Sequence, residues 1–284
     1  MQFGAAIFFT DYSMTPQALG QALEARGFES LWAAEHSHIP LSRKSPWGGG
    51  GELPKQYYDV MDPFVSLTAA AAATKTLKVG TGVCLVNQRD PIQTAKRVAS
   101  LDQVSYGRFL FGIGNGWNQD EMENHGTVFA TRHKLVRERI EAMKEIWTKP
   151  KAEYHGEFVN FDPMMTWPKP VQKPHPPVIV GGAYPYAARR AVRYGDGWIP
   201  LAARPGQYGD VFDYVPKFRA MLTEAGRDAA AFPISLFGST EDADTLKRYR
   251  DLGIVRVVIS LPAAKEDVLL PLLDRWTTLI GSLG

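Results

Sequence analysis

Eight short apolar segments, each followed by a longer segment of helical periodicity, constrain this 284-residue chain more than any other feature. Gly, Pro or Asp stands at nearly every junction, as is typical of strands that alternate with helices. Such an alternation predicts a closed (β/α)8 barrel of the α/β class, because neither end carries the dinucleotide fingerprint expected of an open doubly wound sheet. The expected strands are 3–9, 30–35, 77–85, 108–113, 177–180, 198–201, 234–237 and 255–260.

Candidate helix boundaries support the same organisation. Thr15-Pro16, Asp62-Pro63 and Asp90-Pro91 each place a capping side chain directly before a proline, the preferred start of a helix. Residues 239–242 resemble a capping box for the seventh helix. Pro271 is expected to interrupt the last helix.

Two connections exceed ordinary barrel loops: residues 36–61 after the second strand, and residues 149–176 before the fifth strand. Long connections in a compact domain are usually functional or disordered. The first leaves the C-terminal face, where barrel enzymes build their active sites, so we expect it to form a mobile lid. The second is an insertion, and we expect a single barrel domain over residues 1–284.

Composition argues against several classes of protein. The formal charge is only +2, and the basic residues occur singly or in pairs, so we expect no nucleic-acid partner. Cys84 is the only cysteine, which excludes intrachain disulfides and fits a reducing compartment. No apolar stretch reaches the roughly 18 residues that a membrane helix needs, and the N-terminal segment lacks the marks of a signal peptide. We therefore expect a soluble cytoplasmic protein that binds no membrane.

The second expected strand ends in titratable side chains, Glu35, His36 and His38. Imidazole titrates near neutral pH, so these residues predict acid–base chemistry, with hydrogen-bonded structural histidines as the alternative. The spacing of His36 and His38 also fits a zinc site, but the ends of the fifth, sixth and eighth strands offer no further His or Asp ligand. We expect no metal.

Glycines mark the ends of three other strands. Gly80 and Gly82 on the third strand and the segment 112–116 on the fourth remove side chains from one face. This leaves room for a flat ring against the backbone, with Asn115 and Asn118 as polar contacts, unless the glycines only form a barrel corner. The fifth strand ends in Gly-Gly before a helix, which indicates either a phosphate site or a tight turn.

Together these segments resemble the luciferase-like family of flavin- and deazaflavin-dependent oxidoreductases, over roughly residues 3–200. The resemblance implies a (β/α)8 barrel with an insertion before the fifth strand, which binds coenzyme F420 or FMN at its C-terminal face. The sequence at residues 116–118 is more similar to that of the F420-dependent branch than to that of the FMN monooxygenases. The motifs that carry the resemblance are 31–36, 80–83, 112–118, 169–182 and 195–198.

The resemblance also implies roles for individual residues. His36 matches the catalytic histidine of the sugar-phosphate dehydrogenases in the F420 branch, whereas Trp117 stands where those enzymes carry an acidic residue. This departure argues against the same phosphorylated sugar as substrate. The Gly82-Val83 bond matches the position of a non-prolyl cis peptide behind the cofactor ring. The expected cofactor-binding residues are Gly82, Val83, Gly114, Asn115, Gly116, Asn118, Gly181, Gly182 and Ala183, of which the last three would hold the phosphate.

Three functions remain open at this stage. The first is hydride transfer between F420 and a small organic substrate. In this function His36 moves the proton, and Glu35 orients His36 or raises its basicity. The second is an FMN-dependent monooxygenase, and the third is a cofactor carrier without turnover. Relatives of this kind usually form homodimers, which we expect here too. The expected substrate wall, or alternatively ordinary core, is Trp47, Tyr57, Tyr58 and Trp117.

Overall fold

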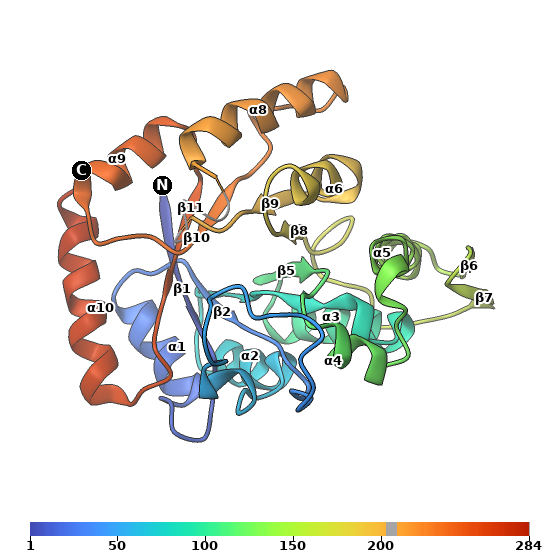
Figure 1. The fold of residues 1–284 in the computed structure, drawn as a ribbon, viewed down its shortest axis with the longest axis horizontal. Helices are drawn as coiled ribbons and strands as arrows, with labels where there is room; N and C mark the ends of the chain where they lie inside the picture. Colours follow the sequence, from blue (N-terminus) through green and yellow to red (C-terminus); the bar gives the residue numbers. More distant parts are fainter. Residues whose placement is uncertain (203–208, 284) are drawn as a thin grey trace.

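The computed structural model describes residues 1–202 and 209–283, and its strands form the predicted parallel barrel (Figure 1). The strand order is β10-β11-β1-β2-β3-β5-β8-β9, and isolated parallel bridges from Trp198 to Ile234 and from Leu201 to Phe237 join the two ends. The third predicted strand is divided into β3 and β4. The strands are β1 (Gln2–Ile7), β2 (Ser30–Ala33), β3 (Lys78–Thr81), β4 (Cys84–Leu85), β5 (Phe109–Gly114), β8 (Val178–Gly181), β9 (Gly197–Ile199), β10 (Ser235–Phe237) and β11 (Arg256–Ser260).

Helices surround the barrel, and their capping residues are mostly those that the sequence predicts. The side chains of Thr15, Asp62 and Asp90 each accept a backbone N–H at the start of a helix. Two expectations are wrong: Asp242 alone caps α9, and Pro271 lies inside a continuous α10. The helices are α1 (Pro16–Ala25), α2 (Pro63–Ala72), α3 (Pro91–Val104), α4 (Gln119–Asn124), α5 (Arg132–Thr148), α6 (Tyr186–Tyr194), α8 (Val211–Glu224), α9 (Ala243–Asp251) and α10 (Glu266–Gly281).

The interior of the barrel is filled by a small apolar cluster around Trp32, whose side chain is 0% exposed. A Cβ atom added at Gly80 would lie 2.7 Å from the indole, and one at Gly112 would lie 3.1 Å from it. The indole therefore occupies the space beside Gly80, whereas the backbone carbonyl oxygen of Thr81 lies closest to the position of a Cβ atom at Gly112. Our expectation that a cofactor ring uses this space is wrong for Gly80, where the indole fills the interior, and for Gly112, where the neighbouring strand lies too close.

The insertion before the fifth barrel strand is ordered. It contains an antiparallel hairpin of β6 (Ala152–His155) and β7 (Asn160–Met164), which lies beside α5 at one end of the molecule (Figure 1). Farther along, the Lys169 ammonium donates to the Lys149 carbonyl at the end of α5, at 2.6 Å. The insertion thus extends the outer surface and leaves the barrel mouth open.

The connection 36–61 lies at the barrel mouth and is tied to its neighbours. The Met61 N–H donates to the Phe9 carbonyl at 2.8 Å, and the Lys44 N–H donates to the Asp120 carboxylate at 2.8 Å. Its short 3-10 helix, η1 (Lys55–Tyr57), places the Tyr57 ring 4.7 Å from that of Phe8. These contacts fit a cover over the mouth, and movement of this cover remains a prediction.

No helix within the described ranges is both long and apolar enough to cross a bilayer.

An ion pair at the opposite end of the barrel gives a prediction for acid stability. The Arg256 guanidinium donates twice to the Glu29 carboxylate, at 2.7 Å each. Burial opposes ionisation of Glu29, but Arg256, Lys78 and Ser30 together outweigh it and lower the pKa of Glu29 from 4.5 to about 2. A lowered folded-state pKa contributes stability above the unfolded value, and this contribution is lost as the pH falls toward 2.

The unfolding free energy of the wild type falls between pH 5 and pH 3. We expect this fall to be about 2 kcal/mol smaller in Glu29→Gln, which lacks the titrating carboxylate. Urea denaturation of both proteins at the two pH values measures it. The exposed Glu266, substituted in the same way, serves as the control. Equal pH dependence in the wild type and Glu29→Gln would contradict the prediction.

Candidate active site

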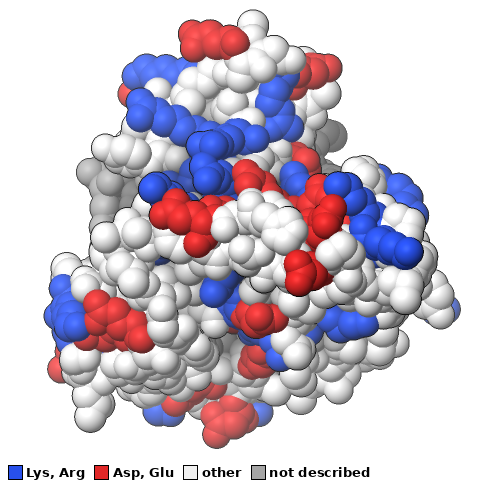
Figure 2. All heavy atoms as spheres, turned by 90° about the vertical axis from the view of Figure 1, so that its right-hand side faces the viewer, with Lys and Arg blue, Asp and Glu red and all other residues white. Residues whose placement is uncertain are grey.

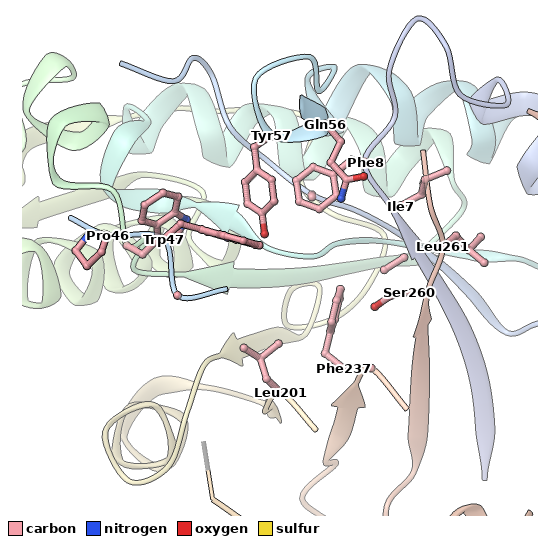
Figure 3. Close-up of a pocket in the computed structure, with 15 residues that line it drawn as sticks. Ile7, Phe8, Pro46, Trp47, Gln56, Tyr57, Leu201, Phe237, Ser260 and Leu261 are labelled. Atoms are coloured by element: carbon pink, nitrogen blue, oxygen red, sulfur yellow. The ribbon is translucent and has the colours of Figure 1, made fainter. Parts of the chain in front are cut away.

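A cavity of about 460 Å³ lies at the C-terminal mouth of the barrel (Figure 3). Its volume is within the usual range for small-molecule sites. No charged side chain lines it among the residues that the structure describes. Tyr57 and Phe8 face Phe237 and Leu201 across the space in Figure 3. The lining is Ala6, Ile7, Phe8, Ala34, Pro46, Trp47, Gly48, Gln56, Tyr57, Trp117, Leu201, Phe237, Gly238, Ser260 and Leu261.

The expected substrate wall is present in part. Trp47, Tyr57 and Trp117 line the cavity, as predicted. Tyr58 does not line it, and this side chain is 52% exposed, because the 3-10 turn directs neighbouring residues to different sides. The expectation for Tyr58 is therefore wrong.

His36 follows β2 and stands beside this wall. Its ring lies 5.4 Å from the Tyr57 ring and 6.1 Å from the Trp117 ring, measured between centroids. The Nδ1 atom is 2.8 Å from the Glu121 Oε2 atom. The side chains of His36 and Glu121 are 7% and 0% exposed, so the pair is shielded from bulk water.

Glu121 is a site residue that sequence reasoning missed. It comes from α4, the short helix that follows β5, and reaches His36 across 85 positions of sequence. Its second oxygen, Oε1, accepts the Ser37 N–H at 3.2 Å. The only signal in the sequence is an acidic residue in the first turn of a helix after a strand end, and this feature is common.

Glu35 does not orient His36, contrary to our expectation. Its Oε2 atom accepts the Leu85 N–H at 2.6 Å, and its Oε1 atom pairs with the Arg89 guanidinium. Burial raises the pKa of Glu35, and the charge of Arg89 opposes that rise. Consecutive residues of an extended segment project to opposite sides, so Glu35 faces β4 while His36 faces the mouth.

His38 belongs to a separate surface network. Its Nδ1 atom lies 2.9 Å from the Ser37 hydroxyl, and the His125 Nε2 atom lies 2.7 Å from the same hydroxyl. Burial, followed by the nearby His38, lowers the pKa of His125. This is the hydrogen-bonded structural role that the sequence left open for one of the two histidines.

Several of the expected cofactor residues meet around Val83. The Gly82-Val83 bond is cis, as the resemblance implies. A Cβ atom added at Gly114 would lie 2.4 Å from the Val83 side chain, and one at Gly181 would lie 2.8 Å from it. Val83 is only half-buried. Its side chain therefore projects at the barrel mouth between Gly114 of β5 and Gly181 of β8, which have no side chains of their own.

Unpartnered polar atoms surround the next part of the mouth. Asn115 Nδ2 and both side-chain polar atoms of Asn118 are buried and have no hydrogen-bond partner among the described residues, and the same holds for Asn87 Oδ1 and the Gln88 amide. Buried amides without partners are uncommon, because their desolvation costs about 1–3 kcal/mol each. The predicted residues Asn115 and Asn118 thus offer the donors and acceptors that the edge of a heteroaromatic ring requires. Gly116 has a φ of 63°.

A basic group lies beside the Gly-Gly turn before α6. Gly182 has a φ of 122°, and a Cβ atom there would lie 3.9 Å from the Arg190 guanidinium. The Nε atoms of Arg190 and Arg132 are buried and unpartnered within the described chain. Burial, then Arg132 and Arg190, lower the pKa of His133 from 6.5 to about 4, so both cations act on this histidine.

Charge is also unevenly spread over the surface on this side. Figure 2 faces the side of the molecule on which α5 and the insertion lie, and Lys and Arg gather there in a band across the upper half of the view. The predicted Gly181, Gly182 and Ala183 precede α6, whose own sequence adds Arg189, Arg190 and Arg193. The donor set next to this turn fits an anion such as a phosphate.

Comparison with known proteins gives consistent relatives. The model of a family described as luciferase-like monooxygenase matches residues 15–265. An uncharacterized protein of Mycobacterium tuberculosis is 38% identical over 275 residues, which cover 94% of each chain. Monooxygenase RslO1 from Streptomyces bottropensis superposes with a TM-score of 0.78 at 19% identity, over 99% of both chains. An F420-dependent secondary alcohol dehydrogenase, solved with an F420-acetone adduct, superposes with a TM-score of 0.74 at 19% identity, over 100% of both chains. At such identity these two structures establish the fold.

Proposed function

Because this chain belongs to the luciferase-like monooxygenase family of oxidoreductases, we propose that it transfers a hydride between coenzyme F420 and a small, uncharged organic substrate. The observation that supports the proposal most strongly is the position of the His36 ring. Glu121 holds this ring beside Tyr57 and Trp117, two residues that line an uncharged cavity. Such an arrangement suits the movement of one proton to or from a substrate that contains no anchoring charge.

The residues at the mouth fit a cofactor of this kind. Val83 would support one face of the ring, and the unpartnered amides of Asn115 and Asn118 would bind polar atoms at its edge. The turn at Gly182, with Arg190 and Arg132, would hold the phosphate that F420 and FMN both carry. When bound, the deazaflavin supplies the hydride chemistry, while the protein supplies binding and orientation.

The cavity lining supports an apolar substrate class. Aromatic and aliphatic side chains form most of the wall, and among the described residues its polar side-chain groups are those of Gln56, Tyr57 and Ser260 and the indole N–H groups of Trp47 and Trp117. Trp117 stands at the position where the sugar-phosphate dehydrogenases of the F420-dependent branch carry an acidic residue. A ketone, a secondary alcohol or an alkene activated by a carbonyl group fits this lining, because each combines one polar oxygen atom with apolar surface.

Two observations favour F420 over FMN. The sequence at residues 116–118 resembles that of the F420-dependent branch, and an F420-dependent alcohol dehydrogenase superposes over the whole chain. An FMN-dependent monooxygenase is the second candidate, because RslO1, a monooxygenase, superposes over nearly the whole chain with a slightly higher TM-score. A homodimer and a single domain remain further proposals, and analytical ultracentrifugation tests the dimer.

A substrate screen tests the proposed reaction. Neutral ketones and alkenes are incubated with reduced F420, and secondary alcohols with oxidised F420, while the absorbance of the oxidised deazaflavin is followed. We expect turnover with at least one uncharged class and at least tenfold lower kcat/KM with a sugar phosphate, because the described lining offers no cation to pair with a phosphate. Turnover only with reduced FMN and oxygen would contradict the F420 assignment.

A further inference from the structure

Glu121 is bound by two donors at once. The His36 Nδ1 atom lies 2.8 Å from Oε2, and the Ser37 N–H reaches Oε1 at 3.2 Å. The Glu121 side chain is 0% exposed, so water does not replace either partner. Both oxygens of one buried carboxylate are therefore committed.

This arrangement determines which ring nitrogen of His36 carries the proton. An ionised carboxylate only accepts hydrogen bonds, so the neutral imidazole must place its proton on Nδ1. The Nε2 atom then keeps a free lone pair. Within the described part of the chain Nε2 makes no hydrogen bond, and the ring lies against Tyr57 and Trp117, which both line the cavity.

We propose that Glu121 is the positioning residue of the reaction, which holds His36 in the tautomer whose Nε2 accepts a proton from the substrate. This inference rests on the proposed function for its chemistry. If an alcohol is oxidised, its O–H bond would give the proton to Nε2 as the C=O bond forms, and the hydride of the C–H bond would go to the bound deazaflavin, which would supply the hydride chemistry. In the opposite direction the same proton returns from Nε2 to the oxygen.

Glu121→Gln tests the proposal because an amide has only one acceptor oxygen. The Ser37 N–H is a backbone donor that cannot give up its proton, whereas the imidazole can exchange tautomers. We therefore expect the amide oxygen to bind Ser37 and the amide N–H to bind His36 Nδ1. The His36 proton then moves to Nε2, which becomes a donor. Glu121→Asp keeps two acceptor oxygens and is the conservative variant.

The primary measurement is two-bond ¹H–¹⁵N NMR of the histidine rings in protein free of cofactor, over a pH series. In the neutral ring of the wild type and of Glu121→Asp, we expect the unprotonated nitrogen to be Nε2; in Glu121→Gln, we expect it to be Nδ1. Glu123→Gln, on the same helix but paired with Lys44 at the surface, should match the wild type. A wild-type neutral ring with its proton on Nε2, or one tautomer in all variants, would overturn the proposal.

Kinetics supply the second measurement. We expect Glu121→Gln to lower kcat by about 10²–10⁴-fold with little change in KM, because the neutral His36 ring then has the wrong tautomer to accept the proton. Glu121→Asp should recover most of this loss. Since the tautomer is read without cofactor, its switch is observable even if F420 is the wrong cofactor. A tautomer switch with unchanged turnover would instead refute the role of His36 and, with it, the proposed function.

Discussion

His36→Ala is expected to lower turnover by about 10²–10⁴-fold while cofactor affinity changes by less than about threefold. The reason is that the His36 imidazole lies beside Tyr57 and Trp117 of the cavity wall, whereas the residues proposed to hold the cofactor surround Val83, Asn115 and Gly182. Steady-state rates with the best substrate of the screen, together with calorimetric titration of F420, measure the two effects separately.

His38→Ala is the matched control for this variant. It removes an imidazole from the same loop, but one that belongs to the Ser37 and His125 network. We expect it to retain turnover within about threefold. If His36→Ala kept the wild-type rate while binding F420 normally, the protein would be a cofactor carrier or would use another acid.

Arg89→Ala is expected to reduce the unfolding free energy by about 3–5 kcal/mol. Arg89 pairs with Glu35, and the two side chains are 11% and 5% exposed. Its other nitrogen pairs with Asp62, which caps α2. Without the guanidinium, the Glu35 carboxylate stays buried with the Leu85 N–H as its remaining backbone partner. Removing one partner of a buried pair costs more than the pair contributes, and urea denaturation at pH 7 measures the loss.

Two comparisons test the stated cause of that loss. Arg250→Ala removes an exposed arginine that pairs with Asp251 on α9 and donates to the Leu283 carbonyl at the surface, so we expect a change below about 1 kcal/mol. The double variant Glu35→Gln with Arg89→Met should be more stable than Arg89→Ala, because it leaves no buried charge unpaired. Equal losses in Arg89→Ala and Arg250→Ala would contradict the assignment of Arg89 as a buried partner.

The strands were predictable because both faces of a barrel strand are buried. Val178–Gly181 and Arg256–Ser260 are therefore nearly continuous apolar segments between turn residues, which the sequence displays directly. Helix starts at Thr15, Asp62 and Asp90 were predictable for a similar reason, since capping is a local interaction. Pro271 was misjudged: it is exposed near the start of α10, and the helix continues past it.

The active site was less predictable, because neighbours in sequence are not neighbours in space. Glu35 adjoins His36 in the chain but faces Arg89, whereas Glu121 reaches His36 from another barrel unit. A glycine pattern shows where side chains are missing and does not show what fills the space. At Gly80 that space holds Trp32, and at Gly114 it holds Val83.

The basic group near Gly182 gave no signal in the sequence. Arg132 and Arg190 belong to different helices, and each reads as an ordinary surface residue in its own segment. Their shared effect on His133 and their unpartnered Nε atoms emerge only from packing. The phosphate site that Gly181 and Gly182 suggested is thereby supported by donors from a second element.

The most direct test of the proposed function is a titration of the purified, cofactor-free protein with F420 and, separately, with FMN, followed by fluorescence or calorimetry. We expect saturable binding of F420 and at least tenfold weaker binding of FMN. Arg190→Ala should weaken the F420 interaction by roughly tenfold, as expected for loss of one cation at a phosphate. Tight FMN binding without measurable affinity for F420 would contradict the proposal and would favour the monooxygenase.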